Sequence, residues 1–182
     1  IYGEGKITKD ELNRMRYRHP LQVIGADNPE LADTFCREAL GRIPTKGNLI
    51  PGAIELLEYL RPKYRMFILS NGFTELQSRK MATAGIDKYF DDIILSEEIG
   101  INKPHPELFE YALKKSNSRL QESIMIGDMF DTDIKGAENI GMHQIFFNSK
   151  GETGHSFAPT YEVKQLLQIK DILIRQWWEF CG

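Results

Sequence analysis

From residue 51 onward, short apolar runs alternate with longer segments in which apolar residues recur every three or four positions. Runs of this kind predict buried strands, and the longer periodic segments predict helices. The predicted strands are residues 65–70, 92–96, 123–127, 143–147 and 161–163. The predicted helices are residues 52–61, 73–84, 106–115, 131–140 and 165–178. Because continuous apolar strands alternating with helices are typical of a parallel sheet covered on both faces, we predict the α/β class with a Rossmann-like sheet.

The first 45 residues show helical periodicity only. Thr8 and Glu11 have the spacing of a capping box, and Asn28 followed by Pro29 predicts the start of a second helix. After that start, apolar residues recur at helical spacing, namely Leu31, Ala32, Phe35, Ala39 and Ile43. The stretch from Pro44 to Pro51 is rich in turn residues. We therefore predict two domains, a helical one at 1–48 and an α/β core at 49–182.

Composition narrows the class of protein. The 182 residues are 41% hydrophobic and carry a net charge of −3, which allows a sizeable core and gives no support for a nucleic-acid partner. No apolar run approaches the roughly 18 residues of a membrane helix, so we expect no membrane partner. Two cysteines, Cys36 and Cys181, suggest reduced thiols and a cytoplasmic protein. The four histidines have no zinc-ligand spacing, and neither a P-loop nor a G-x-S-x-G elbow is present.

Polar side chains follow three of the predicted strands, where ligands bind in open α/β sheets. Ser70-Asn71-Gly72 ends the first strand, Lys103 follows the second, and Asp128 follows the third. Each has an ordinary structural explanation, namely turn chemistry, an exposed lysine, or acidic residues at a helix start. A position at the start of a helix explains Asp131 and Asp133. It explains Asp128 less well, because Asp128 lies at the tip of the strand. Together, a hydroxyl, a cation and carboxylates of the kind that Mg²⁺ prefers suit a phosphoryl group.

These segments resemble three motifs of the haloacid dehalogenase superfamily, in order and at suitable spacing: ILSNG (68–72), INKPHPELF (101–109) and IGDMFDTDIKGA (126–137). The resemblance implies that Ser70 and the amides near Asn71 and Gly72 bind phosphate. It implies that Lys103 stabilises the phosphate and the nucleophile, and that Asp128 binds Mg²⁺. Asp133 would then be the second acid of the site, supporting the metal shell or Lys103. Residues 1–48 would form part of a small helical cap.

One motif of that family is absent. The family places a nucleophilic Asp and a general acid/base Asp, as Asp-x-Asp, at the end of its first and central strand. No such pair occurs before residue 51, and Asp131-Thr132-Asp133 lies inside the last motif instead. We therefore expect the nucleophile strand to lie upstream of residue 1.

The resemblance implies Mg²⁺-dependent hydrolysis of a small phosphomonoester through an aspartyl-phosphate. Asp128 favours a phosphatase over a metal-free dehalogenase. The small cap and SNGF segment are similar to nucleoside 5′-monophosphate phosphatases, including those acting on pyrimidine nucleotides. Two alternatives stay open: a non-catalytic phosphate-binding module of the same fold, and a phosphomutase, phosphonate hydrolase or dehalogenase. We expect a phosphorylated small molecule as the partner, and a monomer or homodimer.

Overall fold

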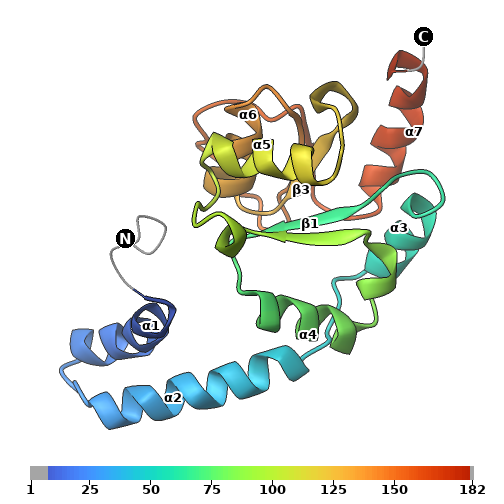
Figure 1. Ribbon diagram of the computed structural model, residues 1–182. Helices are drawn as coiled ribbons and strands as arrows, with labels where there is room; N and C mark the ends of the chain where they lie inside the picture. Colours follow the sequence, from blue (N-terminus) through green and yellow to red (C-terminus); the bar gives the residue numbers. More distant parts are fainter. Residues whose placement is uncertain (1–7, 181–182) are drawn as a thin grey trace. The chain divides into compact units, whose positions relative to one another are not determined.

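The computed structural model describes residues 8–180 (Figure 1). The chain divides into two compact units. The first contains residues up to 48 together with 72–87, and the second contains 49–71 and the residues from 88 onward. This division differs from the predicted domains, 1–48 and 49–182, in grouping residues 72–87 with the first unit. The roles of cap and core stay predictions.

The first unit is helical, and its helices begin at the predicted caps. Helix α1 (Lys9–Val23) has the capping box, in which the Thr8 amide donates to Glu11 Oε2 at 2.7 Å and the Glu11 amide donates to Thr8 Oγ1 at 3.2 Å. Helix α2 (Pro29–Arg42) begins after Asn28, whose Oδ1 accepts from the Leu31 amide at 3.0 Å. The turn η1 (Ile43–Thr45) follows, and α4 (Thr74–Ala84) ends at Gly85 in the left-handed conformation.

The apolar residues at helical spacing on α2 are not all buried. Ala32 and Cys36 are buried, whereas Leu31 and Phe35 are 38% and 44% exposed. The helix carries two apolar stripes one residue apart, and sequence periodicity does not choose between them. Helix α1 packs along α2 and selects the stripe of smaller side chains, which allows close approach of the two helices.

The second unit is a parallel α/β structure, as predicted. Its strands are β1 (Phe67–Ser70), β2 (Asp92–Leu95), β3 (Ile124–Gly127), β4 (His143–Phe147) and β5 (Tyr161–Val163). Strands β1 and β2 form one parallel pair, and β3, β4 and β5 form a second parallel sheet in that order. In the second sheet Gly127 lies opposite Phe146, so β3 and β4 end side by side.

Helices cover both faces of the strands, as the continuous apolar runs require. The elements are α3 (Ala53–Leu60), η2 (Asp87–Tyr89), η3 (Ser96–Glu98), α5 (Pro106–Lys115), η4 (Leu120–Glu122), α6 (Lys135–Glu138) and α7 (Gln168–Phe180). One buried cluster joins α3 and α7 to β4 and β5 through Leu56, Ile145 and Ile169. A second joins α5 and α6 to β1 and β3 around Phe109 and Ala137. None of the described helices is both long and apolar enough to cross a membrane.

The helix predicted at 131–140 is wrong in its first half. Residues Phe130–Ile134 form a π-helical turn, η5, and α6 adds only four residues. The Asp133 amide donates to the Met129 carbonyl at 2.8 Å, and Asp133 Oδ2 accepts from the Met129 amide at 3.1 Å. This double contact fixes Asp133 against the end of β3.

Strands β1 and β3 pack on one buried cluster but do not pair with each other through backbone hydrogen bonds. Among the described residues, β1 pairs only with β2, and β3 pairs only with β4. The four residues of β1 are half-buried and Ile126 of β3 is 36% exposed, whereas the last four residues of β4 are buried. Leu69 of β1 and Met125 of β3 nevertheless pack on the same cluster. Central strands of a parallel sheet are normally buried on both sides. The partial exposure of β1 and β3 is instead typical of strands whose free edge could pair with a further strand.

The loop before β2 gives a pH prediction. Asp91 accepts a hydrogen bond from the Met66 amide at 2.9 Å and one from Arg61 at 3.0 Å. These bonds hold the pKa of Asp91 below its ordinary value of 3.8, and the bond from Met66 has the larger effect. A lowered carboxyl pKa stabilises the fold above the unfolded pKa, and that contribution is lost as the pH falls through the folded one. Asp91→Asn should therefore lower the free energy of unfolding at pH 7 by up to about 1 kcal/mol, and the difference from wild type should shrink below about pH 4. Urea unfolding at pH 7 and pH 3 measures this, with Glu110→Gln on the exposed face of α5 as control. A difference that is the same at both pH values would contradict it.

Candidate active site

The ends of β1 and β2 are joined through Asn71 and Lys103. The Lys103 amide donates to Asn71 Oδ1 at 2.7 Å, and Asn71 Nδ2 donates to the Lys103 carbonyl at 3.1 Å. This pair of bonds fixes the Lys103 backbone beside the tip of β1, where Ser70 is the last strand residue. The predicted residues Ser70, Asn71 and Lys103 therefore lie at one end of the sheet.

Lys103 makes a buried ion pair with Asp133. Its ammonium lies 2.7 Å from Asp133 Oδ1 and also donates to the Leu69 carbonyl at 2.7 Å. The two side chains are only 10% and 8% exposed. The pair connects the loop after β2 to the turn after β3. With its oxygens bound to Lys103 and the Met129 amide, Asp133 is placed to hold the lysine in position.

Gly127 makes this arrangement possible. A Cβ at Gly127 would overlap the Asp133 side chain, so only glycine lets Asp133 fold back against the end of β3. Gly136 serves a similar purpose on α6, where a Cβ would overlap the Phe109 ring and approach the Cα of Pro104 to 3.1 Å. The glycines of the last motif thus bring α6 and its acidic turn close to the loop that carries Lys103.

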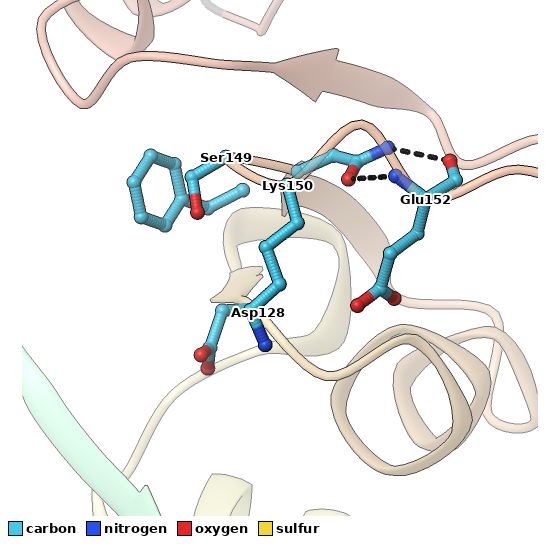
Figure 2. A pocket seen from close by; sticks show the side chains of 6 residues that line it. Asp128, Ser149, Lys150 and Glu152 are labelled. Carbon is cyan, nitrogen blue, oxygen red and sulfur yellow. Dashed lines mark hydrogen bonds between the residues drawn. The ribbon is translucent and has the colours of Figure 1, made fainter.

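Asp128 lies apart from the ion pair, in a small pocket at the ends of β3 and β4. The pocket is lined by Asp128, Phe147, Asn148, Ser149, Lys150 and Glu152. Figure 2 shows the side chains of Asp128 and Lys150 converging in this pocket, with the loop after β4 above them. Asp128 is exposed, so its carboxylate is accessible to a ligand.

Asn148, Lys150 and Glu152 were not among the predicted site residues. They follow the carboxyl end of a parallel strand, as Ser70, Lys103 and Asp128 do, and this position is the sequence signal that points to them.

The carboxylates at the strand ends suit a Mg²⁺ ion that takes only part of its ligands from this chain. No three His, Cys, Asp or Glu side chains of the described residues come together in a way that could hold a metal ion. Mg²⁺ is usually bound through one or two carboxylates, several waters and the phosphate of a substrate. Asp128, exposed in a pocket, offers one such carboxylate, whereas Asp133 is already occupied by Lys103. The residues present therefore fit Mg²⁺ with Asp128 as one ligand.

Comparison with known proteins agrees with this geometry. The chain is 31% identical to pyrimidine 5′-nucleotidase YjjG of Escherichia coli over 176 residues, which are 96% of this chain and 76% of that protein. It is 39% identical over 101 residues, or 55% of the chain and 45% of the relative, to a glyceraldehyde 3-phosphate phosphatase of Methanothermobacter thermautotrophicus. Among solved structures, the magnesium-bound putative HAD-hydrolase YfnB of Bacillus subtilis superposes with a TM-score of 0.85 at 27% identity, covering 95% of this chain and 75% of that one.

The family model for haloacid dehalogenase-like hydrolases matches residues 4–141, about three quarters of the chain. That span includes both halves of the site, the loop carrying Lys103 and the turn carrying Asp128 and Asp133. The two relatives compared above are phosphatases by name. The chain belongs to the haloacid dehalogenase-like hydrolase family.

Proposed function

We propose that this chain provides the phosphate and metal groups of a Mg²⁺-dependent phosphatase acting on small phosphomonoesters. The observation that carries the proposal is the buried Lys103–Asp133 pair, held beside Ser70 and Asn71 at the carboxyl ends of the strands, with Asp128 in a separate open pocket at the ends of β3 and β4. A lysine fixed by two acceptors, with a nearby hydroxyl and an exposed carboxylate, suits a phosphoryl group.

In this proposal each residue of the chain has one role. Ser70 and the amides at Asn71 and Gly72 donate hydrogen bonds to phosphoryl oxygens, and Lys103 binds the same oxygens as a positive charge. Asp133 holds the Lys103 ammonium in place. Asp128 would hold Mg²⁺, which when bound supplies positive charge to the phosphoryl oxygens.

The nucleophile in this proposal is an Asp on a strand outside the chain. Its carboxylate oxygen attacks phosphorus, the bond from phosphorus to the substrate oxygen breaks, and a second Asp gives a proton to the leaving oxygen. Water then gives a proton to the second Asp and attacks phosphorus, the bond from phosphorus to the first Asp breaks, and phosphate leaves with both carboxyl groups restored. The unpaired edges of β1 and β3 support such a strand between them, because its carboxyl end would lie between Lys103 and Asp128.

The names of the relatives suggest a class of substrate. We propose a nucleoside 5′-monophosphate or a similar small metabolite, since one relative is a pyrimidine nucleotidase and another a glyceraldehyde 3-phosphate phosphatase. A cytoplasmic location belongs to the same proposal. The non-catalytic phosphate-binding module is the second candidate, and the presence of Ser70, Lys103, Asp128 and Asp133 argues against it, because a degenerate site need not keep all four.

The test of the proposed function adds a strand that carries the nucleophile to this chain. A βα segment whose strand ends in Asp-x-Asp is joined ahead of Ile1, and phosphate release is measured with pyrimidine nucleotides and glyceraldehyde 3-phosphate, with and without Mg²⁺. We expect Mg²⁺-dependent release from the joined protein and none from the 182-residue chain alone. In the joined protein, Lys103→Met should lower release by at least about 100-fold, the scale of removing one preorganised charge-stabilising group.

The matched control replaces the first Asp of the added pair with Asn, which should abolish release while keeping the fold. Release by the 182-residue chain without the added strand would contradict the proposed nucleophile. A joined protein that folds and binds phosphate without releasing it from any ester would favour the binding module.

A further inference from the structure

The loop after β4 is held in one shape by a buried asparagine. Asn148 is 3% exposed, and its Nδ2 donates to the Glu152 carbonyl and to Glu162 Oε1, both at 2.8 Å. Its Oδ1 accepts from the Glu152 amide at 2.7 Å, and its own amide donates to the Val163 carbonyl at 2.8 Å. Figure 2 shows the bonds to Glu152 that close the loop. The loop tip is therefore anchored to β5, and the position of Lys150 is fixed at its backbone.

Lys150 extends from this tip into the pocket beside Asp128 (Figure 2). Within the part of the chain that the structure describes, no carboxylate lies within 4.0 Å of its ammonium, and it has no hydrogen-bond partner. A lysine on an ordered loop, pointing toward an acidic strand end but bound to nothing, keeps its charge available to a ligand.

The two lysines at this end of the sheet differ in how their charge is balanced. Lys103, on the β1–β2 side, already pairs with Asp133 at 2.7 Å. Lys150, on the β4 side, lies in the pocket with Asp128 and is not paired with it. Without a bound Mg²⁺, a dianionic phosphate beside the Asp128 carboxylate needs positive charge in addition to a lysine that is already neutralised. Lys150 is positioned to provide it.

We propose that Lys150 is a phosphate-binding residue, whose ammonium donates a hydrogen bond to a phosphoryl oxygen on the β4 side of the site, opposite Lys103. This rests on the proposed function, because it assumes that phosphate binds at the ends of β1 and β3. The site would then include the end of a fourth strand, β4, and Asn148 would be the residue that positions Lys150.

The test is a titration of the 182-residue chain with inorganic phosphate in a buffer free of divalent cations, followed by ³¹P NMR and calorimetry. Lys150→Met should weaken phosphate binding at least about fivefold, the low end for a hydrogen bond to a charged group, because the pocket is open to solvent. Lys150→Arg should restore most of the affinity. Lys164→Met, at an exposed lysine after β5, is the matched control and should bind as wild type does.

The outcomes separate this inference from the proposed function. If Ser70→Ala weakens binding and Lys150→Met does not, the phosphate site stands and the role of Lys150 is wrong. If the wild-type chain binds no phosphate, the role of Lys150 is wrong, whereas the proposed function is decided separately by phosphate release from the joined protein with Mg²⁺. Thermal unfolding of Lys150→Met should match wild type, because the side chain is exposed. A loss of binding that Lys150→Arg does not restore would contradict a role through charge.

Discussion

Replacing Lys103 with methionine is expected to lower the free energy of unfolding by about 3–5 kcal/mol, the scale on which removing one partner of a buried ion pair destabilises a protein. Methionine keeps the length and apolar stem of the lysine but removes the ammonium. Asp133, 8% exposed, then loses the partner that lay 2.7 Å away. The Leu69 carbonyl also loses its bond from Nζ. Because small domains are stable by only about 5–15 kcal/mol in total, this one change can remove a large share of the stability.

Urea unfolding followed by circular dichroism measures the effect, and the chain offers a matched lysine. Lys115 contacts Glu98 at 2.8 Å and Asp92 at 3.2 Å, but its side chain is 30% exposed. Since exposed ion pairs are worth about 1 kcal/mol or less, Lys115→Met should cost far less than Lys103→Met. Equal losses at the two sites would contradict a special role for burial.

A second variant separates the lost pair from the lost packing. In Lys103→Met with Asp133→Asn, the amide replaces the unpaired charge and can still accept from the Met129 amide. Most of the lost stability should return, because the penalty comes chiefly from leaving one buried charge alone. If the double variant is as unstable as Lys103→Met, the penalty lies in packing around the lysine instead.

Most helices and strands of both units could be predicted because their signals are local. Each strand is an apolar run, and the helix starts at Thr8 and Asn28 depend on residues three positions apart. The alignment of Ser70, Lys103 and Asp128 at one end of the sheet follows from parallel strand direction alone. The strands and the two helix starts, which depend on one segment each, were therefore confirmed, whereas the roles of Ser70, Lys103 and Asp128 stay predictions.

What could not be predicted depends on partners distant in the sequence. The turn at Phe130–Ile134 is shaped by Asp133, which bonds to Lys103 thirty residues earlier. The stripe of α2 that faces inward is chosen by α1. The loop that presents Lys150 is fixed by Asn148 through bonds to Glu162 and Val163 on β5. Apolar periodicity and local motifs carry no information about these contacts.

The second large effect is expected at Gly127, where alanine should lower the free energy of unfolding by about 3 kcal/mol. The added methyl would occupy the space of the Asp133 Cβ and carboxylate, so Asp133 must move away from the end of β3. That movement would also separate it from Lys103. Gly41→Ala is the matched control, because Gly41 lies in α2 with nothing within 4 Å of its added Cβ. It should be neutral or stabilise by up to about 1 kcal/mol, since alanine favours helix.

The decisive measurement combines Gly127→Ala with Lys103→Met. If Gly127→Ala acts by pushing Asp133 away from Lys103, removing the lysine as well can add little, and the double variant should lose clearly less than the sum of the two single losses. Distant, independent changes would instead add to within about 0.5 kcal/mol. An additive result would mean that the glycine serves only the tip of β3. A strongly sub-additive one would mean that strand end, acidic turn and lysine loop act as one unit, which is what a site assembled from three separate segments requires.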